Sequence, residues 1–149
     1  MRTINHIIGG EEVVSTSGRT SPVYNPATGE VTSEGGLAST EEVDRAVAAA
    51  SAAFEDWSAT SIARRTAVMY RFRDLVDQRR DDIAALLTAE HGKVLSDSLG
   101  EIQRGIENIE YACGLAEHLK GSFSQEVSTD VDVYSIRQPL GVVAGITPF

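Results

Sequence analysis

One arginine, Arg104, stands where a charged side chain could meet a ligand. The surrounding segment predicts a helix over residues 96–120, with Gly121 as its stop signal. One face of this helix is apolar, at a turn of about 100° per residue, and carries Leu99, Ile102, Ile106, Ile109, Cys113 and Ala116. The opposite face carries a mixed set, Arg104, Tyr111, Leu115 and His118.

A helix with apolar or aromatic residues on both faces is expected to be covered on both, so Arg104 is predicted to be semi-buried beside Tyr111. A semi-buried guanidinium needs an anionic partner. That partner is either an internal carboxylate, the commoner case in proteins, or the carboxylate of a ligand held by the guanidinium fork. Gly100 and Gly105 each lower helix propensity by roughly 1 kcal/mol. They therefore indicate close packing of another backbone or a ligand against that turn.

The other residue types capable of chemistry lack the spacing that chemistry needs. His6, His91 and His118 share no ligand spacing with one another or with Cys113, so no metal site is predicted. Cys113 lies on the apolar face of the predicted helix, where a buried thiol is a core residue rather than a nucleophile. The chain has no Gly-x-Gly-x-x-Gly or Walker sequence.

The elements that precede this helix follow from local patterns. A hairpin is predicted around Gly9-Gly10, because glycine supplies the positive φ of a tight turn between two short apolar pieces. Residues 25–30 have the composition of a turn between two extended segments. Three amphipathic helices are then predicted: 39–57, which starts with the capping box Ser39-x-x-Glu42; 61–80; and one from 81 that ends at Gly92.

Two extended segments are predicted after the last helix. Residues 130–137 alternate polar and apolar side chains, as in a half-exposed strand at a sheet edge or at a subunit interface. Residues 139–149 form a short apolar run with β-branched residues, which predicts a buried parallel strand. Ligands of parallel sheets collect at the carboxyl ends of strands. We therefore expect the amino-terminal part of a larger α/β protein, which ends where the nucleotide-binding core begins. On pattern alone, the apolar run could equally be the last strand of a small α+β domain.

The composition restricts the compartment and the partners. The chain has 149 residues and a formal net charge of −9. The phosphate attraction that dominates nucleic-acid binding is therefore missing, and no nucleic-acid partner is expected. A single cysteine fits a reducing compartment. No segment has the length and apolarity of a membrane span or a secretory leader, so we expect a cytoplasmic protein without a membrane partner.

Four segments together resemble the amino-terminal part of the aldehyde dehydrogenase superfamily, in matching order and spacing over essentially the whole chain. They are Ile8-Gly9-Gly10, Asn25-Pro26-Ala27-Thr28-Gly29-Glu30, Glu90-x-Gly92-Lys93 and the strand from Gly141 to Phe149. Within the superfamily, residues 100–110 resemble the CoA-acylating methylmalonate-semialdehyde dehydrogenases. The resemblance implies a truncated α/β fold: a hairpin, four helices, an edge strand and the first strand of a Rossmann-like NAD-binding sheet.

The resemblance also implies an activity. Such enzymes oxidise methylmalonate or malonate semialdehyde with NAD and yield propanoyl-CoA or acetyl-CoA. A cysteine thiolate attacks the aldehyde, hydride passes to the nicotinamide, and the thiol of coenzyme A resolves the thioester. In the family, the arginine at the position of Arg104 binds the substrate carboxylate, and Ile146, Thr147 and Phe149 line the nicotinamide half of the NAD site. Members are homo-oligomers, usually tetramers.

By the same resemblance, residues 1–149 are the amino-terminal portion of the NAD-binding domain, with the strand at about 130–137 in the oligomerisation region. The catalytic domain is absent, and with it the nucleophilic cysteine, so no catalytic residue is predicted in this chain. The chain alone is expected to be inactive. Its apolar Val142, Val143 and Ile146 are expected to be partly exposed and prone to aggregation, because their sheet neighbours are missing.

Two alternatives remain beside this interpretation. Another aldehyde dehydrogenase, for example one for succinate semialdehyde, would use an arginine for a carboxylate equally well, and CoA dependence separates the two. A non-enzymatic module could instead associate through the strand around residues 131–136 and the uncovered terminal strand. Such a module gives a defined oligomer in size-exclusion chromatography.

Overall fold

The strands form three small sheets at two ends of the chain. In the computed structural model, which describes residues 2–147, β1 pairs parallel with β5 and β4 pairs antiparallel with β5. The pairs β2–β3 and β6–β7 are separate antiparallel hairpins. The seven strands are β1 (Arg2–Ile4), β2 (His6–Ile8), β3 (Glu11–Val13), β4 (Thr20–Tyr24), β5 (Val31–Gly36), β6 (Ser122–Ser128) and β7 (Val131–Ser135).

The two predicted turns near the amino terminus are confirmed. Gly9 and Gly10 join β2 to β3 with φ values of +63° and +85°, the left-handed pair that a two-residue hairpin turn requires. Between β4 and β5, the Asn25 side chain accepts a hydrogen bond of 2.9 Å from the backbone N–H of Ala27. Gly29 then takes a positive φ of +75°.

Five helices lie between the amino-terminal strands and β6. They are α1 (Thr40–Ala59), α2 (Ile62–Gln78), α3 (Arg80–His91), α4 (Leu95–Cys113) and α5 (Leu115–His118). The first three agree with the sequence prediction. The helix predicted over residues 96–120 is confirmed over most of its length, but it is divided at Gly114 into α4 and α5. There the N–H of Gly114 bonds to the Tyr111 carbonyl at 3.0 Å and tightens the last turn of α4.

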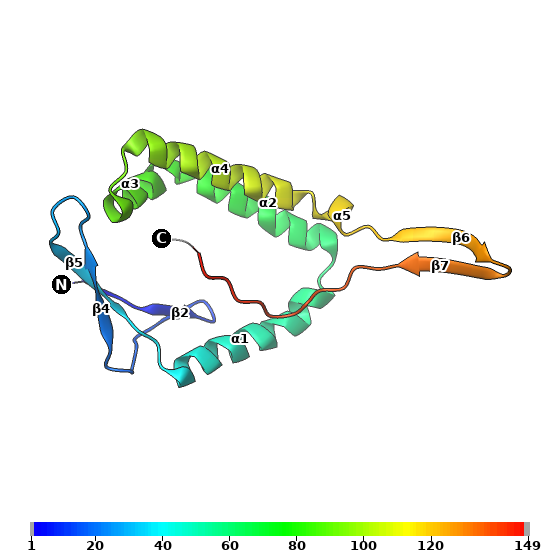
Figure 1. The fold of residues 1–149 in the computed structure, drawn as a ribbon, viewed down its shortest axis with the longest axis horizontal. Coiled ribbons are helices and arrows are strands. Elements are labelled where there is room, and N and C mark those ends of the chain that lie inside the picture. Colours follow the sequence, from blue (N-terminus) through cyan, green and yellow to red (C-terminus); the bar gives the residue numbers. More distant parts are fainter. Residues whose placement is uncertain (1, 148–149) are drawn as a thin grey trace.

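Helices α2, α3 and α4 form the α2–α4 layer, which holds most of the core of the described chain. Figure 1 shows α4 lying along α2, with α3 at one end of the pair. Ala84 and Ile106 have no exposed surface, and Cys113 is 6% exposed. The fully buried hydroxyl of Ser98 lies 2.8 Å from Thr88 Oγ1 and so ties α4 to α3. None of the helices in residues 2–147 is both long and apolar enough to cross a bilayer.

Helix α1 diverges from the α2–α4 layer and joins the amino-terminal strands instead (Figure 1). Its predicted capping box is confirmed, because Ser39 and Glu42 bond reciprocally at the first turn. An amphipathic helix normally buries its apolar stripe, but Val43, Val47 and Trp57 are 51%, 50% and 45% exposed. The β2–β3 hairpin and the segment near Val142 line shallow pockets together with this stripe.

The last part of the chain departs most from the prediction. The strand expected at residues 130–137 is confirmed as β7, but its partner β6 lies in a stretch for which no strand was predicted. The expected strand at the carboxyl terminus is not formed. Residues 136–147 contain no strand and run between α1 and the α2–α4 layer (Figure 1). A parallel strand needs a hydrogen-bonded neighbour, and the described residues provide none there.

Candidate functional site

Arg104 lies on the outward face of α4, and this face is open to solvent. Arg104 is exposed and Tyr111 is 70% exposed. The predicted semi-buried state is therefore wrong for the chain as it stands. Its premise was that a second element covers the Tyr111 side, but α2 and α3 pack on the opposite side of α4, and Tyr111 only stacks on His118, with ring centroids 4.3 Å apart.

The apolar face of α4 is the face that packs against the rest of the layer. Ile106 and Cys113 are buried there, as the helical spacing predicted. Cys113 is a free thiol. A buried thiol among helix contacts serves as a small apolar residue. Arg104 and Cys113 thus lie on opposite sides of the same helix, and only Arg104 can meet a ligand from solution.

The space over Gly100 is used by Arg104 itself. A Cβ atom at Gly100 would lie 3.9 Å from Nη1 of Arg104, and one at Gly105 would have nothing within 4 Å. No other backbone packs on this turn within residues 2–147, contrary to the expectation from the two glycines. The guanidinium therefore folds back along α4 toward its amino-terminal end.

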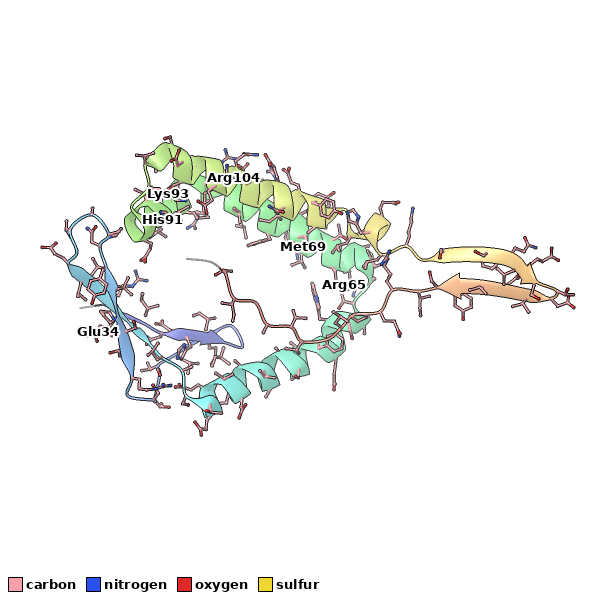
Figure 2. All side chains as sticks on the ribbon, in the orientation of Figure 1. Glu34, Arg65, Met69, His91, Lys93 and Arg104 are labelled. Atoms are coloured by element: carbon pink, nitrogen blue, oxygen red, sulfur yellow. The ribbon has the colours of Figure 1, made fainter. Side chains whose placement is uncertain are left out.

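Several charged side chains lie between Arg104 and the amino-terminal end of α4. Lys93, from the connection between α3 and α4, forms an ion pair with Glu101 of α4. Its hydrogen bond is the main reason that the pKa of Glu101 is lowered. The charges of Lys93 itself, Arg104 and His91 lower it further. Figure 2 shows His91 and Lys93 at the junction of α3 and α4, and Arg104 farther along α4.

The guanidinium of Arg104 makes no ion pair or hydrogen bond within the part of the chain that the structure describes; only its backbone carbonyl accepts one, from Asn108 at 2.8 Å. The sequence left two possible partners for Arg104, and the first of them, an internal carboxylate, is thus not paired with its guanidinium. An exposed guanidinium fork can hold a carboxylate through two parallel N–H···O bonds. This arrangement can recognise a small anionic ligand.

The residues predicted to line the cofactor site are not assembled into one. Ile146 is 99% exposed, so neither Arg104 nor any other described side chain covers it. Thr147 is also exposed, and Phe149 lies outside the described residues. A dinucleotide is normally held at the end of a sheet strand beside a helix amino terminus. Residues 142–147 offer neither, so the described residues do not by themselves form an NAD site.

Two segments that carried the sequence resemblance meet in space. Gly92 ends α3 with φ of +81°, and a Cβ atom there would lie 2.9 Å from Cγ of Pro26 in the turn after β4. Only glycine suits both the left-handed conformation and the close approach. The turn at residues 25–30 and the end of α3 therefore fix each other, and Lys93 follows directly.

Glu42, predicted from the sequence only as part of a helix cap, has a wider role in the structure. This carboxylate is 3% exposed and accepts bonds from the backbone N–H groups of Thr16 at 2.6 Å and Ser39 at 2.7 Å. Ser15 Oγ donates a third bond of 3.2 Å. These bonds, led by that from Ser39, lower the pKa of Glu42 to about 2. The capping box was the only sequence signal for this role. The bonds from Ser15 and Thr16 could not be predicted, because these residues are distant from Glu42 in sequence.

Among residues 2–147, no group of three or more His, Cys, Asp or Glu side chains is arranged to hold a metal ion. The arrangement around Arg104 is therefore the feature with the clearest ligand chemistry in this part of the chain.

Known proteins resemble the chain closely over its whole length. A model of the aldehyde dehydrogenase family matches residues 13–149. Malonate-semialdehyde dehydrogenase of Pseudomonas aeruginosa is 48% identical over 149 residues, which are 100% of this chain and 30% of that protein. Malonate-semialdehyde dehydrogenase 3 of Geobacillus kaustophilus is 46% identical over 148 residues, 99% of this chain and 31% of the relative.

Solved structures of similar proteins also match the chain over nearly its whole length. A Sinorhizobium meliloti protein assigned as a methylmalonate-semialdehyde dehydrogenase and complexed with NAD matches with a TM-score of 0.95 and 42% identity. The match covers 99% of this chain and 30% of that one. Methylmalonate-semialdehyde dehydrogenase of Oceanimonas doudoroffii matches with a TM-score of 0.89 and 46% identity, over 94% and 28% of the two chains. The chain thus spans 28% to 31% of the length of these four proteins.

Proposed function

This chain belongs to the aldehyde dehydrogenase family, and we propose that it serves as the amino-terminal part of an enzyme that oxidises malonate or methylmalonate semialdehyde. The proposed enzyme uses NAD as hydride acceptor and coenzyme A as acyl acceptor, and the substrate carboxylate leaves as CO2, so the products are acetyl-CoA or propanoyl-CoA together with CO2 and NADH. Identity of 48% across the whole chain to a malonate-semialdehyde dehydrogenase is the observation that carries the proposal.

Arg104 gives the proposal its chemistry within this chain. Both semialdehydes carry a carboxylate one carbon atom away from the reacting carbonyl group, and this carboxylate distinguishes them from simple aldehydes. An exposed guanidinium without an internal partner can bind that carboxylate by charge-assisted hydrogen bonds. Arg104 therefore orients the substrate, while the nucleophile and most of the cofactor site lie in the part of the enzyme that this chain does not contain.

The assignment of residues to larger units is also part of the proposal. Residues 1–149 form the amino-terminal portion of the NAD-binding domain, in which Ile146, Thr147 and Phe149 line the nicotinamide half of the NAD site. The strand at about 130–137 contributes to the oligomerisation region of a cytoplasmic homotetramer. In support, β6 and β7 are exposed at every residue and leave an edge free on each side of the hairpin.

Coenzyme A dependence tests the activity and separates it from that of a succinate-semialdehyde dehydrogenase. In the full-length protein, malonate semialdehyde and NAD should give acetyl-CoA, detected by mass spectrometry, only when coenzyme A is present. Faster turnover of succinate semialdehyde, with free succinate as product and no response to coenzyme A, would reject the proposal in favour of the alternative.

Replacement of the arginine tests the substrate contact. In the full-length enzyme, Arg104→Ala should raise KM for malonate semialdehyde by the equivalent of about 1.5 to 3 kcal/mol, or roughly 10- to 150-fold, because a charge-assisted bond is lost. Arg104→Lys should recover only part of this loss, since a point charge cannot reproduce the bidentate fork. Steady-state kinetics with propanal, which has no carboxylate, should show little change.

A matched control separates recognition from a general effect of charge. Arg71 is an exposed arginine on α2, so Arg71→Ala removes the same charge away from α4. Its KM for malonate semialdehyde should stay at the wild-type value. Equal loss with both aldehydes in Arg104→Ala, or a lower melting temperature with KM unchanged, would make Arg104 a structural residue.

A further inference from the structure

The ion pair between Lys93 and Glu101 lies about one helical turn before Arg104, close enough for the charge of Arg104 to help lower the pKa of Glu101. Glu101 and Arg104 are three residues apart on α4, which is the spacing at which oppositely charged side chains of a helix pair. The guanidinium of Arg104 already folds back over Gly100, toward the turn that carries Glu101. In the absence of a competitor, Glu101 is therefore the natural internal partner of Arg104.

The competitor is Lys93. Its side chain is only 20% exposed, whereas a lysine without a fixed role normally extends into solvent. It reaches from the connection after α3 to the Glu101 carboxylate. Gly92, immediately before it, is locked by its left-handed backbone and by Pro26, so the position of Lys93 is set by the fold rather than by the pair itself.

We propose that Lys93 is a positioning residue for substrate binding: its ammonium group occupies the Glu101 carboxylate and so leaves the Arg104 guanidinium free for the carboxylate of the substrate. Lys93 does not touch the substrate in this arrangement. It acts through Glu101, by removing the internal anion that would compete for the arginine. The inference rests on the proposed function and deepens it, because it explains why Arg104 is unpaired next to a carboxylate.

Four variants of the full-length enzyme test this role. Lys93→Met removes the charge and keeps the length of the side chain, so Glu101 becomes free to pair with Arg104. KM for malonate semialdehyde should then rise about two- to fivefold, the range expected from competition with an exposed ion pair. The kcat and the KM for propanal should not change. The double variant Lys93→Met with Glu101→Gln should return KM to the wild-type value, because no carboxylate is left to compete.

The remaining two variants separate competition from other effects. Glu101→Gln alone should leave KM unchanged, since Arg104 is already free; a general field effect would instead lower KM, and that result would overturn the inference. Lys120→Met is the matched control, because it breaks the pair between Lys120 and Glu117 beyond the end of α4. It should leave both KM values unchanged.

The outcomes also distinguish this inference from the proposed function. An unchanged KM in Lys93→Met, or a double variant that stays impaired, would show that Lys93 only ties the α3–α4 connection to α4. If Arg104→Ala still raised KM in that case, the proposed function would stand and the positioning role would be rejected. If Arg104→Ala left KM unchanged, the carboxylate contact would fail and the positioning role with it.

Discussion

The α2–α4 layer has a buried core, whereas the segment that follows α5 has no buried side chain in the described chain. In the layer, Ala84 and Ile106 have no exposed surface. From residue 121 to residue 147, every residue except Gly141 is exposed, and this stretch includes Tyr134 at 73% and Ile146 at 99%. The two regions have similar apolar content locally, so composition does not explain the difference.

The difference in burial follows from how far apart in the sequence the packing partners of each region lie. Helices α2, α3 and α4 follow one another with short connections, so each finds its packing partner within a few tens of residues. Strands β6 and β7 pair only with each other, and residues 136–147 pair with no strand in the described chain. A β-type sequence with free edges needs neighbours from another chain or from a distant segment. The comparison therefore separates a region whose core is formed by neighbouring helices from a region in which the described residues have no buried side chain.

The largest expected effect comes from making the same substitution in both regions. Ile106→Ala should lower the free energy of unfolding by about 2 to 5 kcal/mol, because it leaves a cavity in the α2–α4 layer. Ile146→Ala should change it by less than about 0.5 kcal/mol, because the side chain is exposed. Urea unfolding followed by circular dichroism at 222 nm, the signal of helices, measures both.

The same pair of variants also tests aggregation. Ile146→Ala should reduce the loss of protein to light-scattering particles, since it removes exposed apolar surface, whereas Ile106→Ala should increase that loss. Similar unfolding energies for the two variants would mean that the terminal segment is packed in solution, and the contrast between the regions would disappear.

The features that sequence predicted well depend on neighbours within a few residues. Ser39 and Glu42 define the start of α1, and Gly92 defines the end of α3, because cap bonds and a left-handed φ are local requirements. The turn at Gly9-Gly10 follows in the same way. The end of α4 was missed although Gly114 marks it, because Gly121 offered an equally plausible stop farther along the apolar stripe.

The features that sequence missed depend on distant partners. The parallel pairing of β1 with β5 and the whole of β6 have no local signal; β6 is rich in serine, and Glu126 and Asp130 take positive φ values without being glycine. The candidate site around Arg104 was also only partly predictable from the sequence. Arg104 could be identified as a residue with a function, but its exposure and the pairing of Lys93 with Glu101 depend on how the α3–α4 connection folds back.

A smaller effect is expected at the base of the β6–β7 hairpin. A Cβ atom at Gly121 would lie 1.8 Å from the backbone oxygen of Ser135, so Gly121→Ala must move one strand. The cost should be about 1 to 3 kcal/mol and confined to the hairpin. Amide hydrogen exchange should speed up in β6 and β7 and stay unchanged in α4.

Gly145→Ala is the control for this prediction, because a Cβ atom there meets nothing within 4 Å. Its exchange profile should match that of the original chain. Faster exchange in α2 or α4 of the Gly121→Ala variant would show that the hairpin is coupled to the α2–α4 layer, and that the two regions are less independent than their burial indicates.

The smallest effect is a pH dependence carried by one carboxylate. The pKa of Glu42 is lowered from 4.5 to about 2, so its bonds to Thr16 and Ser39 require the charged form. A group with a depressed pKa in the folded state stabilises the fold fully above its unfolded value, and this contribution is lost as pH falls through the folded value. The contribution of Glu42 should therefore be complete above about pH 4.5 and disappear toward pH 2.

Melting temperatures of the original chain and of Glu42→Gln, recorded from pH 7 to pH 2, measure this dependence. The difference between them should be constant from pH 7 to about pH 5 and then narrow as Glu42 takes up a proton. The amino-terminal strands and α1, which Glu42 joins, should lose helix and strand signals first, while the α2–α4 layer is retained. A difference that stays constant down to pH 2 would mean that Glu42 is not charged in the folded chain, and that ordinary capping by Ser39 alone holds the start of α1.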